Sequence, residues 1–276
     1  MSLLKLSYFA DNKGRNELTR LIFAVGSIDY QDDLVNYLQY TAMRDAGLLP
    51  WGQLPILTIS SCDSDENDVI VGQSCSIARY AARRAGLYPK DEIAALRSDE
   101  VIDSWRDFLD LYYDAFFDRK VLGGRMMMVP RKPIDRTMRF KVLWNAELGQ
   151  QFERYEKLLA KNDGQLFATS NVSFPCWADL AIYDIAKTME GAMTLETFAD
   201  VMESKPNIKK LMQKTEALEA IQEHLKKHPY TDTSSFFAPV SIGQRLLHAL
   251  LFPIIELALC LISRYSLMVR PKQKSV

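Results

Sequence analysis

Four short stretches of the chain place polar side chains at the ends of expected strands and helices, where side chains can meet a ligand. They are Tyr8, Gly14-Arg15, Gln53-Leu54-Pro55 and Gln73-Ser74. A helix that begins at Ser74 would present unpaired backbone N–H groups and the positive end of its dipole, and both favour a bound carboxylate. Ser74 acting only as a helix N-cap is the alternative. The residues alone leave both interpretations open.

Tyr8 and Arg15 are the side chains in these stretches that could act on a reacting atom. A tyrosine at the end of a strand is commonly a packing residue. Arg15 lies at the beginning of an expected helix, where its positive charge opposes the helix dipole. This unfavourable position slightly favours a functional role for the arginine.

The elements that must position these residues form an α/β unit of about 85 residues. Strands are expected at 3–9, 54–59 and 69–71, with another near 30–35, and helices at 16–25 and from Ser74 onward. A loop-rich segment leads to the strand at 54–59. Pro55 cannot donate to a strand ladder, so it should lie at the beginning of that strand, where a cis peptide bond is one plausible arrangement.

The second half of the chain has a different composition. Amphipathic stretches follow at 91–118, 133–161, 176–190, 195–203 and 207–227, and strand signals largely disappear. We therefore expect a thioredoxin-like domain at 1–85, an all-helical domain at 91–228, a linker at 229–240 and a C-terminal tail at 241–276. The fold class predicted is α/β plus all-α.

Composition excludes several classes of protein. The chain has 276 residues, 48% of them hydrophobic, and a formal net charge of −1, which provides no global field for nucleic acid. Its 4 cysteines lack a CxxC pair and its 3 histidines all lie near the C-terminus, so neither a metal site nor a disulfide framework is expected. A reducing, cytoplasmic location fits best.

The four polar stretches, in this order and followed by a helical half, resemble the glutathione transferases, most closely their tyrosine-type, sigma-like class. The resemblance spans roughly residues 3–228. It implies glutathione as co-substrate, an apolar electrophile or lipid as second substrate, and a homodimer. It also implies transfer of the glutathione sulfur, peroxidase activity or prostanoid isomerisation. The alternative is a binding or structural protein that keeps the fold without catalysis.

The resemblance assigns roles to individual residues. Tyr8 and Arg15 would stabilise the glutathione thiolate, while Phe9, Tyr112 and Phe116 would line the electrophile site. Glutathione itself would be held by Tyr40, Arg44, Gln53, Leu54, Pro55, Gln73, Ser74 and Asp99. Tyr40 and Arg44 replace the family's usual tryptophan and lysine in the glycyl carboxylate pocket, and Asp99 would reach across the dimer. Trp51 fits the position of an aromatic dimer contact, with local packing as the alternative.

The C-terminal tail is not required by any soluble member of this family. Residues 246–269 are the most apolar stretch of the chain, but Pro253 and Glu256 interrupt it. Leu247, Leu250 and Ile254 lie opposite its polar side chains on a helical wheel, which is an amphipathic pattern. Membrane attachment and packing against the protein's own surface both fit this pattern.

Overall fold

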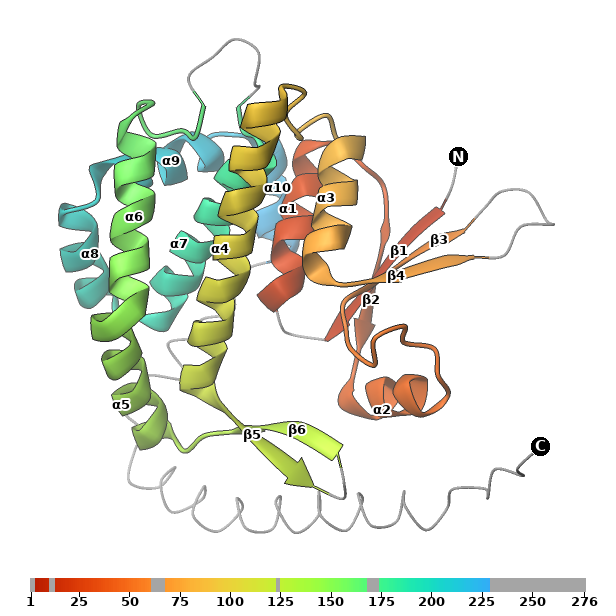
Figure 1. Ribbon diagram of the computed structural model, residues 1–276. Helices are drawn as coiled ribbons and strands as arrows, with labels where there is room; N and C mark the ends of the chain where they lie inside the picture. The colour runs from red at the N-terminus through yellow and green to blue at the C-terminus, as the bar shows by residue number, and fades with distance from the viewer. Residues whose placement is uncertain (1–2, 10–12, 61–67, 123–124, 168–173, 229–276) are drawn as a thin grey trace, which may run out of the picture.

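The computed structural model describes residues 3–9, 13–60, 68–122, 125–167 and 174–228 (Figure 1). The expected linker at 229–240 and the tail at 241–276 lie outside the described residues. Among the described residues, no helix combines the length and the apolar character needed to cross a membrane.

The N-terminal part is built on a four-stranded sheet in the order β2-β1-β3-β4. Its strands are β1 (Leu3–Phe9), β2 (Gln31–Val35), β3 (Ile56–Ser60) and β4 (Val69–Gly72). β1 pairs with β2 in parallel and with β3 antiparallel, and β4 pairs antiparallel with β3. The expected α/β unit is therefore confirmed, including the strand near 30–35.

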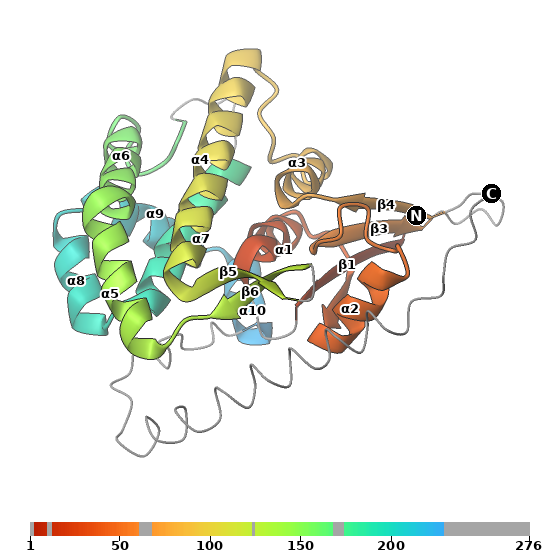
Figure 2. The same cartoon turned by 60° about the horizontal axis from the view of Figure 1, so that its bottom comes forward.

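Two helices of this part lie between the sheet and the helical part, as both views show (Figures 1 and 2). They are α1 (Glu17–Val25), which follows a 3₁₀ turn at Gly14–Asn16, and α3 (Ser74–Arg84). Leu18, Leu21 and Ile22 follow helical spacing and are fully buried. They share one core cluster with Leu4 and Leu6 of β1, so packing of α1 fixes the end of β1 relative to the helical part.

A further helix, α2 (Tyr37–Asp45), occupies the segment expected to be loop-rich. Its hydrophobic periodicity is weak, and the helix is instead begun by a capping box. The Gln39 backbone N–H donates to Asn36 Oδ1 at 2.9 Å, and the Asn36 N–H donates to Gln39 Oε1 at 2.8 Å. The expectation of a loop at this position was wrong because it relied on apolar spacing.

The second half is mostly helical, as expected, but it also contains a hairpin that the sequence analysis did not predict. Two strands, β5 (Phe117–Leu122) and β6 (Arg125–Pro130), pair antiparallel directly after α4 (Glu92–Phe116). The sequence between them is Gly123-Gly124, which is a recognised hairpin signal when it separates two strand-forming runs.

The other helices complete a core around α7 (Trp177–Ala192), which is buried along most of its length. α5 (Pro133–Leu143) continues through a π-helical turn at Trp144–Leu148 into α6 (Gly149–Ala160), and α8 (Leu195–Glu203), α9 (Pro206–Glu216) and α10 (Glu219–Lys227) follow α7. Trp105 of α4 donates its indole N–H to buried Asp184 of α7 at 2.9 Å. The domain boundaries at 85–91 and 228 remain predictions.

Candidate active site

Tyr8 lies at the end of β1, opposite Leu34 of β2, and is 5% exposed. Its phenol oxygen accepts the backbone N–H of Arg15 at 3.3 Å. Burial raises the pKa of Tyr8, although the bond from the Arg15 N–H and the charge of Arg15 oppose the rise. The hydroxyl therefore keeps its proton at neutral pH and can donate it to an acceptor.

Arg15 turns its guanidinium toward α4. It pairs with Asp110, and its Cζ lies 5.6 Å from the centre of the Tyr113 ring. The 3₁₀ turn at Gly14–Asn16 positions the Arg15 backbone N–H toward Tyr8 while its side chain bridges to α4. The charge of Arg15 also lowers the pKa of Tyr8, so the two predicted catalytic residues are electrostatically coupled.

The turn that leads into β3 has the expected form. The Leu54–Pro55 peptide bond is cis, Leu54 is buried and Gln53 is exposed. The ladders to β1 and β4 begin at Ile56, so the Leu54 main chain lies just outside the paired part of the strand. A peptide could extend the sheet at this position by main-chain hydrogen bonds.

The interpretation of Ser74 as a helix N-cap was wrong. Gln73 is the N-cap, with φ of 75° and ψ of 110°, and its side chain makes no capping hydrogen bond. Ser74 is the first residue of α3 and is 7% exposed. The first-turn N–H groups of α3 therefore lack the usual side-chain acceptor, which leaves them available to an anion.

Tyr40 and Arg44 lie one turn apart on α2. The Tyr40 hydroxyl donates to the Gly52 carbonyl at 3.0 Å, and its ring meets Phe9 edge-on with the centroids 5.1 Å apart. The Arg44 Cζ lies 5.2 Å from the centre of the Tyr40 ring. Tyr40 therefore ties α2 both to the end of β1 and to the turn before β3.

Comparison with known proteins adds independent information. A family model described as "Glutathione S-transferase, C-terminal domain" matches residues 125–228. "Glutathione S-transferase 3" of Caenorhabditis elegans is 27% identical over 227 residues, which cover 82% of this chain and 97% of the relative. The resemblance to the glutathione transferases seen in the sequence is confirmed by this domain match and this relative.

Two further comparisons concern proteins of the sigma-like kind. "Hematopoietic prostaglandin D synthase" of Gallus gallus is 27% identical over 228 residues, covering 82% of this chain and 97% of the relative. The structure titled "Fasciola hepatica sigma class GST" is 18% identical and superposes with a TM-score of 0.66, covering 84% of this chain and 99% of that chain. The glutathione S-transferase fold predicted from the sequence is confirmed.

Asp99 is bound within its own subunit. Its two carboxylate oxygens accept from Arg79 Nε and from the Tyr88 hydroxyl, both at 2.9 Å. Arg79 in turn lies over the Trp177 ring at 5.5 Å. The carboxylate thus joins α3 to α4 near the helical core, and its predicted contact across a dimer remains a prediction.

The aromatic side chains of α4 divide between two sides of the helix. Tyr112 and Phe116 are buried, and the ring centres of Phe116 and of Phe140 on α5 lie 6.4 Å apart. Both predicted substrate-binding residues therefore pack in the helical core. Tyr113, one residue further along the helix, faces Tyr8 and Arg15 instead. The sequence marks this helix as aromatic, but which ring faces the site depends on the rotation of α4 about its axis.

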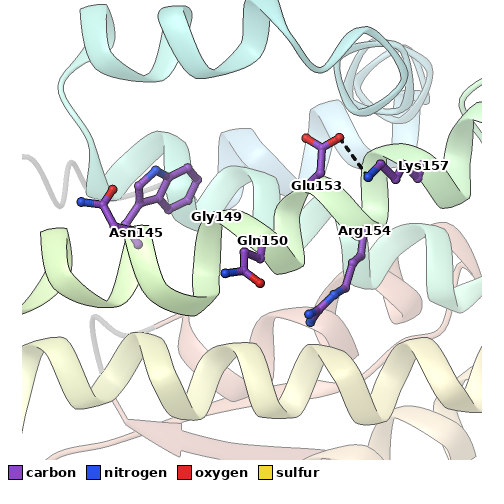
Figure 3. Close-up of a pocket in the computed structure, with 7 residues that line it drawn as sticks. Asn145, Gly149, Gln150, Glu153, Arg154 and Lys157 are labelled. Carbon is purple, nitrogen blue, oxygen red and sulfur yellow. Dashed lines mark ion pairs between the residues drawn. The ribbon is translucent and has the colours of Figure 1, made fainter.

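A separate hollow lies along the π-helical turn and α6 (Figure 3). It has a volume of about 480 Å³ and is lined by Trp144, Asn145, Gly149, Gln150, Glu153, Arg154 and Lys157. All its lining residues come from the π-helical turn and α6, and Glu153 and Lys157 form an ion pair along α6 at 3.8 Å. It shares no residue with the glutathione S-transferase site predicted above.

Among the described residues, no group of three or more His, Cys, Asp or Glu side chains could hold a metal ion.

Proposed function

We propose that this protein is a glutathione S-transferase that activates the thiol of glutathione for attack on an apolar electrophile. The observation that carries the proposal is the buried hydroxyl of Tyr8 at the end of β1, whose oxygen accepts the Arg15 N–H. A free thiol has a pKa near 8.5, so most of it is protonated at neutral pH. A hydroxyl donor at the sulfur stabilises the thiolate and increases its population.

The reaction follows from that ionisation. The glutathione thiol loses its proton to solvent, and the Tyr8 O–H donates a hydrogen bond to the sulfur anion. The sulfur electron pair then forms a bond to an electrophilic carbon, while the electron pair of the bond that breaks leaves with the departing group. Arg15 adds positive charge near the same position, although Asp110 partly balances it.

The anchoring of glutathione would use the predicted binding residues. The open first turn of α3, at Gln73 and Ser74, suits the γ-glutamyl carboxylate. The main chain of Leu54 suits the cysteinyl amide, and Arg44 beside Tyr40 suits the glycyl carboxylate. In this proposal, three polar groups of one extended tripeptide bind to α3, to the turn before β3 and to α2.

The electrophile is proposed to be apolar, because the rings of Phe9 and Tyr113 adjoin Tyr8. Peroxide reduction and prostanoid isomerisation use the same thiolate. The relative named as a prostaglandin D synthase supports testing a prostanoid endoperoxide beside a standard aryl halide.

The decisive experiment compares the wild-type protein with Tyr8→Phe. We expect turnover to fall by ~10- to 100-fold while affinity for glutathione stays within about twofold, since the hydroxyl acts on the ionisation of the sulfur. Full activity in Tyr8→Phe would show that another group activates the thiol. Glutathione binding without turnover of any electrophile, in the wild type, would favour the non-catalytic alternative.

We propose a homodimer as the working assembly. Apolar side chains are exposed on Trp51 and on the edge strand β4, at Val69 and Ile70. The Trp51 indole lies against Gly72, where an added Cβ would come within 2.8 Å of it, so the ring covers the end of this edge strand. Exposed apolar side chains on an edge strand are commonly covered by a partner.

We further propose that residues 246–269 hold this otherwise cytoplasmic protein at a membrane surface. The amphipathic spacing of the segment and the basic residues after it, Arg270, Lys272 and Lys274, support this assignment. Truncation after Ser241 should leave glutathione transfer unchanged and move the protein from the membrane pellet to the soluble fraction. A full-length protein that is soluble without detergent and does not bind liposomes would contradict the proposal.

A further inference from the structure

The β5–β6 hairpin continues directly from α4, the helix that carries Asp110 and Tyr113. Both views show it extending from the end of α4 toward α2, on the side of the protein where β1 ends (Figures 1 and 2). We propose that this hairpin forms a wall of the electrophile site, and that Arg119 on it selects electrophiles with an apolar body and a carboxylate end. This inference rests on the function proposed above and names the class of its second substrate.

A row of contacts leads from Tyr8 to the first residue of the hairpin. The Tyr8 oxygen accepts the Arg15 N–H at 3.3 Å, and the Arg15 Cζ lies 5.6 Å from the centre of the Tyr113 ring. The centres of the Tyr113 and Phe117 rings are in turn 6.2 Å apart. Asp110, Tyr113 and Phe117 follow helical spacing, so they continue one side of α4. The hairpin therefore begins on the side of α4 that faces the predicted catalytic residues.

The register of the hairpin determines which residues share the face that begins at Phe117. Opposed residues of an antiparallel ladder lie on the same face, and so do alternate residues along one strand. The pairs on this face are Phe117 with Pro130, Arg119 with Met128, and Val121 with Met126. Apart from Arg119, every residue at these positions is apolar. The face thus combines apolar residues with a single positive charge.

The charge of Arg119 is exposed and is not balanced within the described part of the chain. Two other arginines near this end of α4 do have acidic partners. Arg15 pairs with Asp110, and Arg131 pairs with Asp118. Among the residues that the structure describes, no acidic side chain pairs with Arg119. A guanidinium binds a carboxylate through two parallel N–H···O bonds, so Arg119 suits an anionic end of a ligand.

The two properties of this face together define the class of ligand. An electrophile without charge would leave the attraction of Arg119 unused, and a small polar electrophile would leave the apolar positions uncovered. A fatty acid with an electrophilic centre in its chain uses both properties, because its chain covers the apolar face and its carboxylate meets Arg119. Such a ligand also keeps its carboxylate partly in water, which agrees with the exposure of Arg119.

The test compares a long-chain fatty acid that carries a conjugated enone with the methyl ester of the same acid, both below their critical micelle concentrations. In each compound the glutathione sulfur forms a bond to the β-carbon, the electron pair of the double bond moves to the α-carbon, and a proton from solvent adds there. The compounds differ in the charge at the end of the chain. With the full-length wild type we expect KM for the acid to be about three- to tenfold lower than for the ester.

Arg119→Gln should remove this preference. We expect it to raise KM for the acid by about three- to tenfold and to leave KM for the ester unchanged. Arg119→Lys keeps the charge without the planar fork, so it should retain part of the preference. Arg154→Gln is the matched control, because Arg154 is also an exposed arginine, lies on α6 and changes the net charge equally when replaced. This control should keep the wild-type KM for both compounds.

Three outcomes would overturn the proposal. They are equal KM values for acid and ester in the wild type, an equal rise for both compounds in Arg119→Gln, and the same effect in Arg154→Gln as in Arg119→Gln. Failure of the proposed function has a different signature, since the wild type would then transfer glutathione neither to these compounds nor to a standard aryl halide. Transfer to the aryl halide without any preference for the acid would refute only the inference about Arg119.

Discussion

Replacement of Asp184 by asparagine should stabilise the folded protein at alkaline pH far more than at acid pH. Asp184 is 2% exposed on α7 and accepts the indole N–H of Trp105 at 2.9 Å. Burial, followed by the negative charge of Glu17, raises its pKa from 3.8 to about 8. The carboxyl is therefore protonated in the folded protein at neutral pH, whereas it is ionised in the unfolded chain.

The sign of the pH dependence follows from proton counting. Between pH 4 and 8 the folded state binds one more proton at this site than the unfolded state, so the free energy of unfolding decreases as the pH rises. Within this range, each pH unit lowers the free energy of unfolding by about 1.4 kcal/mol. From pH 5 to pH 8 this single group lowers the stability of the wild type by at most about 4 kcal/mol. Asparagine keeps an oxygen acceptor for Trp105 and has no such dependence.

The assay is urea unfolding of wild type and Asp184→Asn at pH 5, 6.5 and 8, followed by far-ultraviolet circular dichroism. Titrating groups that do not interact with Asp184 contribute equally in both proteins, so they cancel in the difference between the two free energies of unfolding. We expect this difference to increase with pH in favour of Asp184→Asn. A difference that stays constant from pH 5 to pH 8 would refute the buried, protonated state of Asp184.

Two predictions concern the binding of glutathione. Ser74→Ala should raise KM for glutathione by about tenfold or more and leave kcat nearly unchanged, because an anchoring hydrogen bond to a charged group binds ground state and transition state alike. Steady-state kinetics checks this, and a fall in kcat at constant KM would contradict it; Gln73→Ala should behave in the same way. Asp99→Ala should weaken glutathione binding only in the dimer if the residue reaches across subunits. Because Asp99 also holds Arg79 and Tyr88, thermal unfolding must be measured in parallel. Full affinity in a monomeric form of the protein would remove the cross-subunit role.

Local signals were sufficient for part of this structure. The strand at Leu3–Phe9, the helix that ends before Gly26 and the cis bond before Pro55 all depend on a few neighbouring residues, and each was predicted. The failures at α2 and at the β5–β6 hairpin have local causes as well. At α2 the signal is the capping box of Asn36 and Gln39, and at the hairpin it is the pair of glycines in the sequence between β5 and β6. Hydrophobic periodicity is weak in both segments and did not reveal either element.

The sequence by itself determined which residue types stand at the ends of β1, β3 and β4, because hydrophobic runs and their polar ends are properties of short segments. Tertiary structure decided which of those residues meet. The rotation of α4 places Tyr113 rather than Tyr112 beside Tyr8, and the approach of α4 to the 3₁₀ turn pairs Arg15 with Asp110, 95 positions away. Helical spacing defines faces only relative to one another, and the direction in which a face points depends on packing against elements distant in the chain.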